Sequence, residues 1–140
     1  MRSPAAPPTS SPPACYEGTF PGYTDQARNV RGALANWLAP EGCPAAVIDS
    51  AKVAASELAA NAVLHSASRG ASFTIRCQIG AGYVRIEAED LGGPWRPRKP
   101  DDRPHGLDLI EALAGSGNWG SEPTSDGHRI VWVRLPREQQ

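Results

Sequence analysis

The 140-residue chain has little cysteine, no long run of basic residues and no long apolar run. Its three cysteines, Cys15, Cys43 and Cys77, are odd in number, widely spaced and without a Cys-x-x-Cys pair. This pattern suits neither a disulfide framework nor a zinc site. We therefore expect three reduced cysteines that pack as small hydrophobic side chains.

Charge and hydropathy exclude two further classes of protein. The formal net charge is -1, which argues against a protein that holds nucleic acid by neutralising its phosphates. No stretch approaches the roughly 20 apolar residues of a membrane-spanning helix, and the opening segment 1–8 lacks the apolar core of a signal peptide. We expect a cytoplasmic protein that contacts neither nucleic acid nor membrane directly.

The length fits one compact domain with room for a hydrophobic core. Residues 1–15 are rich in Pro, Ala, Ser and Thr and have no periodic apolar face, so burial there cannot offset the entropy of ordering the chain. The sequence therefore predicts a flexible tail at 1–15 and a single folded domain at 16–140.

Hydrophobic periodicity predicts the elements of that domain. Apolar residues recur every three or four positions, which is typical of helices, and the helical ranges are 24–38, 45–66 and 106–114. Alternation predicts strands, and the ranges are a short edge strand at 19–22, a hairpin of 72–79 with 84–90, and a last strand at 129–135. The segment 91–104 is dense in glycine, proline and charge and predicts a surface loop. Helices on one face of a mixed, mostly antiparallel sheet make a two-layer α+β sandwich.

One predicted helix carries polar residues at four-residue intervals, namely Glu57, Asn61 and His65. At about 100° per residue they lie on adjoining turns of one face. Beside them runs an apolar stripe of Val47, Ala51, Ala54, Leu58 and Ala62. Neither helix propensity nor packing favours Asn or Glu at the edge of a buried seam, so this spacing indicates a functional face. In the alternative interpretation Glu57 is solvated, Asn61 makes a local hydrogen bond and His65 simply ends the helix.

Two glycine-containing segments follow. Asp90-Leu91-Gly92-Gly93 comes after a strand, where a carboxylate can accept hydrogen bonds and glycines let a flat ligand approach the backbone. An ordinary turn has the same composition. Pro104-His105-Gly106-Leu107 opens a helix, whose N–H groups and dipole favour a phosphate. An ordinary helix entry is the alternative there.

In this order, the helix with Glu57 and Asn61, the strand end at Asp90 and the helix entry at Gly106 resemble the N box and two glycine boxes of one ATPase superfamily. That superfamily is shared by gyrase, Hsp90, histidine kinases and MutL. Over about residues 18–136 the chain looks like the small anti-sigma factor serine kinases of actinomycetes. Further segments that match this family are Phe20-Pro21-Gly22, Ser56-Glu57-Leu58, Trp119-Gly120, Gly127 and Val131-Trp132.

The resemblance implies roles for these residues. The residue matching Glu57 is the base toward a substrate serine, and the one matching Asn61 ligates the Mg²⁺ that bridges the phosphates of ATP. The residue matching Asp90 receives the adenine amino group. The nucleotide site is implied to include the glycine-box residues Gly92, Gly93, His105, Gly106 and Leu107. We expect a structural role for His65, and the basic residues of the loop that corresponds to the family's lid could meet phosphates, namely Arg96, Arg98, Lys99 and Arg103.

The resemblance also implies partners: a sigma factor, and a STAS-domain anti-sigma factor antagonist as phosphorylation substrate. Family members commonly form homodimers. The chain departs from the family pattern at Pro104-His105, where Gly-Arg is usual, and at His128-Arg129-Ile130, which lacks the threonine often found on the last strand. Three hypotheses remain: an ATP-dependent serine kinase, a nucleotide-binding partner module without phosphoryl transfer, and an interaction domain that has lost nucleotide.

Overall fold

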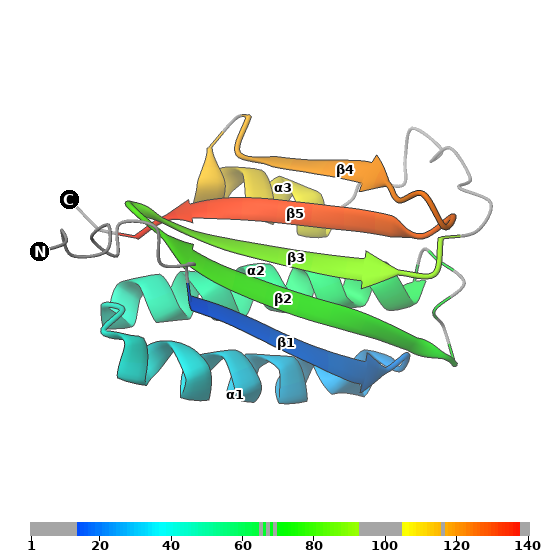
Figure 1. Ribbon diagram of the computed structural model, residues 1–140, viewed down its shortest axis with the longest axis horizontal. Helices are drawn as coiled ribbons and strands as arrows, with labels where there is room; N and C mark the ends of the chain where they lie inside the picture. Colours follow the sequence, from blue (N-terminus) through cyan, green and yellow to red (C-terminus); the bar gives the residue numbers. More distant parts are fainter. Residues whose placement is uncertain are drawn as a thin grey trace, which may run out of the picture.

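The computed structural model describes residues 14–64, 66, 68, 70–92, 105–115 and 117–137, with backbone only at 105–108. Three helices and five strands lie in these ranges (Figure 1). The helices are α1 (Ala27–Leu38), α2 (Ala45–Leu64) and α3 (His105–Ala114), with 3-10 turns at Thr24–Gln26 and Ala39–Glu41. The strands are β1 (Ala14–Pro21), β2 (Ser72–Gly80), β3 (Tyr83–Asp90), β4 (Trp119–Pro123) and β5 (Arg129–Pro136).

The strands form one sheet in the order β1-β2-β3-β5-β4, and each of the four pairings is antiparallel. Figure 1 shows the three helices together on one side of this sheet. The predicted two-layer α+β sandwich is confirmed. The sheet is antiparallel throughout the described strands, so its predicted mixed character is not observed.

The core lies between the two layers. Along β2 and β3 every second residue is buried, as alternation predicts for a sheet covered on one face only. All five residues of the predicted α2 stripe are fully buried. Cys43 and Cys77 are buried as expected, and burial raises the pKa of the Cys77 thiol to about 12. Cys15, in contrast, is exposed on the edge strand.

Several element boundaries differ from the prediction. Strand β1 begins at Ala14, so Ala14 and Cys15 belong to the sheet and not to the tail. The α-helix α1 begins three residues after Thr24, because a 3-10 turn precedes it. Helix α2 ends at Leu64, and α3 begins one residue earlier than expected, at His105.

Strand β4 was not predicted. Its sequence Trp-Gly-Ser-Glu-Pro does not alternate, and its burial does not alternate either. It is an edge strand that pairs only with β5, a position where proline and glycine are tolerated. None of the described helices is both long enough and apolar enough to cross a membrane.

Candidate functional site

The polar face of α2 presents Glu57 and Asn61 one turn apart, both half-buried. Neither side chain has a hydrogen bond to another residue within the described part of the chain. The same face carries two exposed apolar residues, Val53 and Leu64, which are 38% and 51% exposed. The half-buried Glu57 and Asn61 therefore lie between the exposed apolar residues Val53 and Leu64 along the helix. His65 lies outside the described residues.

Asp90 ends β3 and is the most buried charged residue of the described chain, at 1% exposure. Its Oδ1 accepts a hydrogen bond of 2.8 Å from the backbone N–H of Gly92. Its Oδ2 accepts two hydrogen bonds from Arg129, from Nε at 3.1 Å and from Nη2 at 2.8 Å. Asp90 and Arg129 face one another directly across β3 and β5. A buried carboxylate needs such partners, since an unpaired buried charge is strongly destabilising.

Ser68 connects the end of α2 to the end of β3. It is fully buried, and its Oγ accepts a 2.8 Å hydrogen bond from the N–H of Leu91, the residue after Asp90. The turn after the helix that carries Glu57 and Asn61 is thereby held against the strand end that carries Asp90. The hydrogen bond therefore sets the C-terminal end of α2 next to the end of β3.

Gly22 fits closely against the same turn. Its N–H donates to the carbonyl of Ala71 at 3.1 Å, and its carbonyl accepts from the N–H of Gly70 at 2.9 Å. A Cβ at Gly22 would lie 1.8 Å from the backbone oxygen of Ser68. The glycine of the Phe20-Pro21-Gly22 segment is therefore required by a close backbone approach.

Gly92 is also required by backbone geometry. Its φ is +70°, and a Cβ there would lie 2.3 Å from the carbonyl oxygen of Gly127 in the β4–β5 turn. The sequence predicts that this glycine lets a flat ligand approach the backbone. The structure shows two further reasons for a glycine here: the backbone has a left-handed φ, and the β4–β5 turn leaves no room for a Cβ.

The other sequence-predicted residues are only partly placed. The backbone of His105, Gly106 and Leu107 forms the first turn of α3, which packs beside α2. A helix start lies where the sequence predicted one, and the first N–H groups of an α-helix have no partner within the helix. Gly93, Pro104 and the basic loop residues Arg96, Arg98, Lys99 and Arg103 lie outside the described residues.

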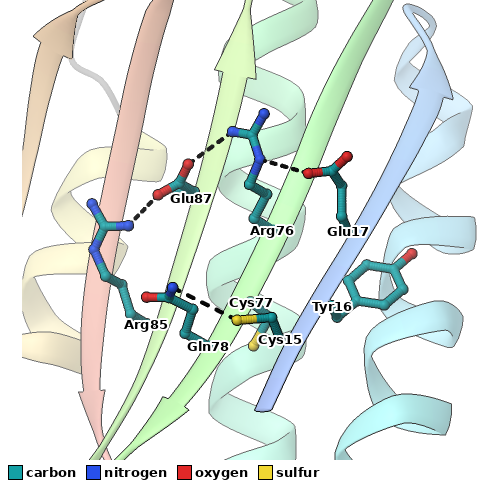
Figure 2. Close-up of a pocket in the computed structure, with 8 residues that line it drawn as sticks. All are labelled: Cys15, Tyr16, Glu17, Arg76, Cys77, Gln78, Arg85 and Glu87. Atoms are coloured by element: carbon teal, nitrogen blue, oxygen red, sulfur yellow. Dashed lines mark hydrogen bonds and ion pairs between the residues drawn. The ribbon is translucent and has the colours of Figure 1, made fainter. Parts of the chain in front are cut away.

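The open face of the sheet carries charged residues that pair with one another. Figure 2 shows Arg76 between Glu17 and Glu87, at 3.0 and 2.9 Å, with Arg85 on the far side of Glu87. These residues line a depression of about 200 Å³. Because each cation in it already contacts a carboxylate, we assign no ligand to this depression.

A second charged group lies at the end of the same face. The Nδ1 atom of His128 is 2.7 Å from Oε2 of Glu89 and 3.7 Å from Oδ2 of Asp126. The hydrogen bond to Glu89 raises the pKa of His128, and the hydrogen bond from His128 lowers the pKa of Glu89. The oxygen and nitrogen donors of all three residues lie within 4.8 Å of one another. We interpret the group as an ion-pair cluster that fastens the β4–β5 turn to β3.

Sequence reasoning missed Ser68 and the partner role of Arg129. Arg129 was expected at the start of the last strand. Its position opposite Asp90 depends on the register of two strands, and the sequence does not predict that register for residues 39 positions apart. No role was predicted for Ser68, which lies just after the predicted helix 45–66. For both Ser68 and Arg129, the sequence feature that could have indicated a role is a polar side chain at the end of a predicted core element.

Several solved structures share this fold. The RsbU and RsbW domains of Rv1364c from Mycobacterium tuberculosis match with a TM-score of 0.69 and 23% identity, over 91% of this chain and 33% of that chain. This chain therefore spans about a third of the length of that solved chain. The SiaB-SiaC complex from Pseudomonas aeruginosa matches with a TM-score of 0.52 and 15% identity, over 91% of this chain and 92% of that chain. At these identities the likeness shows the fold alone.

The sequence itself matches a family model. No curated protein sequence matches the chain closely. The model described as a histidine kinase-like ATPase domain matches residues 20–130, most of the chain, including α2, the end of β3 and the start of α3. The chain therefore belongs to the histidine kinase-like ATPase domain family.

Proposed function

We propose that the protein is an ATP-dependent anti-sigma regulatory factor with serine kinase activity toward a STAS-domain antagonist. The observation that carries this proposal is the hydrogen bond from the N–H of Leu91 to Ser68. It holds the turn after the Glu57 and Asn61 helix against the strand end with Asp90. This contact supports a single site made of the proposed base, metal ligand and adenine acceptor.

The residues present fit a bound nucleotide and its metal. Asn61 offers a half-buried amide oxygen, which is the hard ligand type that Mg²⁺ prefers. Bound Mg²⁺ supplies charge neutralisation at the ATP phosphates. Asp90 offers a buried carboxylate to a base, and the first turn of α3 offers backbone N–H groups to phosphate oxygens.

Glu57 serves as the general base in this proposal. Its carboxylate accepts the proton of the substrate serine hydroxyl while that oxygen bonds to the γ-phosphorus and the bond to the β-phosphate oxygen breaks, which releases ADP. Glu57 is half-buried and lies one turn from Asn61, so that both can face one γ-phosphate.

A protein substrate needs a docking surface near this base. Val53 and Leu64 are exposed apolar residues on the same face of α2, one on each side of Glu57 and Asn61. One neighbouring structure contains an RsbW domain and the other is a complex of SiaB with SiaC, which supports a search for a protein partner of this chain. The sigma factor, the antagonist and the homodimer stay predictions.

The test is calorimetric titration with ATP in the presence and absence of Mg²⁺, followed by transfer of labelled γ-phosphate to STAS-domain antagonists. We expect Asn61→Ala to weaken Mg-ATP binding, because a metal ligand is lost. Glu57→Gln should abolish transfer and leave ATP affinity nearly unchanged.

The matched control is Asp49→Asn, an exposed carboxylate on the same helix two turns earlier, which should change neither measurement. Equal loss of binding and transfer in Glu57→Gln would refute its role as base. Unchanged Mg-ATP affinity in Asn61→Ala would refute its role as metal ligand.

A nucleotide-binding module without transfer is the second candidate. The departure at Pro104-His105 favours it, because proline has no N–H to offer a phosphate and neutral histidine carries no charge. Metal-dependent ATP binding with no transfer to any STAS-domain antagonist would select this candidate. No binding at millimolar ATP would remove both.

A further inference from the structure

Arg129 is the residue of the last strand that lies directly across the sheet from Asp90. It shares the helix-facing side of β5 with the buried residues Val131 and Val133. Its side chain is only 13% exposed and that of Asp90 is 1% exposed. The pair is thus buried at the end of the sheet where the proposed adenine acceptor lies, and a role for Arg129 in nucleotide binding rests on that proposed function.

The hydrogen bonds at Asp90 nearly exhaust its capacity. An ionised carboxylate has about four lone-pair sites, two on each oxygen. Both Arg129 hydrogen bonds fall on Oδ2, and the Gly92 N–H occupies one site of Oδ1. Within the described part of the chain no other donor reaches Oδ1, so one site there remains for a ligand donor.

A single acceptor site selects among nucleobases. Adenine offers one exocyclic amino group at position 6, and that group needs one acceptor. Guanine has a carbonyl at position 6, which a carboxylate repels, and its N1–H and amino donors together need two acceptors side by side. Arg129 occupies the oxygen that the second guanine donor would need.

We propose that Arg129 is a specificity-determining residue that restricts Asp90 to one acceptor site and so selects 6-aminopurine over guanine nucleotides. It acts through Asp90 and has no part in phosphoryl transfer. Without Arg129, both oxygens of Asp90 become available to the paired donors of guanine.

The test compares dissociation constants for Mg-ATP and Mg-GTP by calorimetry. We expect the unmodified protein to prefer ATP by roughly 10- to 100-fold, the range for leaving one buried polar group unpaired. Arg129→Met should reduce this preference to within about threefold. Arg129→Lys keeps the positive charge but lacks the planar guanidinium that places two N–H groups on one oxygen, and it should reduce the preference part of the way.

The matched control is Arg134→Met. Arg134 lies on the same strand but on the open face, 4.2 Å from the ring centre of Tyr83, so its loss should leave the ratio unchanged. If Arg129→Met does not fold, the Lys variant and the unmodified protein decide the outcome, because the readout is a ratio of affinities and not stability.

Three outcomes overturn the inference. If the unmodified protein binds Mg-ATP and Mg-GTP with dissociation constants within threefold of each other, the role of Arg129 in specificity is refuted and the proposed function stands. An ATP preference that Arg129→Lys and Arg129→Met both keep in full would show that Arg129 is only structural. Failure of the unmodified protein to bind either nucleotide would remove the proposed function and the inference together.

Discussion

The close fit of Gly22 against the turn after α2 leads to a sharp prediction for Gly22→Ala. The added Cβ would lie 1.8 Å from the Ser68 carbonyl oxygen, 2.9 Å from the Ser68 carbonyl carbon and 3.1 Å from the Gly70 nitrogen. All three are backbone atoms, so no side chain can rotate away. The turn must move by more than 1 Å.

That movement breaks or stretches the two backbone hydrogen bonds that Gly22 makes with Ala71 and Gly70. At about 1 kcal/mol each, these account for about 2 kcal/mol, and overpacking adds about 1–3 kcal/mol. Because part of the strain is relieved when the bonds yield, we expect a total of about 2–4 kcal/mol. For a domain of this size that lowers Tm by roughly 6–15 °C.

Thermal melting followed by far-UV circular dichroism measures the change. Gly32→Ala is the matched control, because Gly32 lies inside α1 with no atom within 4 Å of its added Cβ. This control should raise stability by about 0.5–1 kcal/mol, since alanine favours helix. If the Tm of Gly22→Ala equals that of the unmodified protein, the steric argument is refuted.

Two other features give predictions of their own. The raised pKa of His128 stabilises the fold below about pH 6.5, its unfolded value, and the lowered pKa of Glu89 stabilises it above about pH 4.3. The Tm difference between the unmodified protein and His128→Gln should therefore be largest between these values and shrink as the pH rises through the raised pKa; a difference that grows above neutral pH contradicts the assignment. Gly92→Ala should cost about 2–4 kcal/mol in urea unfolding, because its φ of +70° and the Gly127 carbonyl both oppose a side chain. Gly82→Ala, with φ +80° and open space around it, should cost only about 1 kcal/mol, and equal costs for the two would contradict the role of the close contact.

The sequence by itself determined the elements that bury one regular face. The apolar stripe of α2 and the alternating residues of the β2–β3 hairpin were predicted correctly, because a period of 3.6 or 2 directly records which side faces the core. The same logic set Glu57 and Asn61 at the edge of the buried stripe. Turn residues such as Gly82 and Gly127, both with positive φ, were also readable from local composition.

Only the tertiary structure decided what depends on pairing. Strand β4 has no periodic pattern, and β1 begins earlier than its composition suggests, because edge strands are held by hydrogen bonds to a neighbour rather than by two buried faces. The partners of Asp90 come from the register of β3 on β5, and the approach of Ser68 to Leu91 comes from how α2 meets the sheet. A one-residue slip of that register would turn Arg129 to the other face, so the contact that surrounds the proposed adenine acceptor is a property of the assembled sheet.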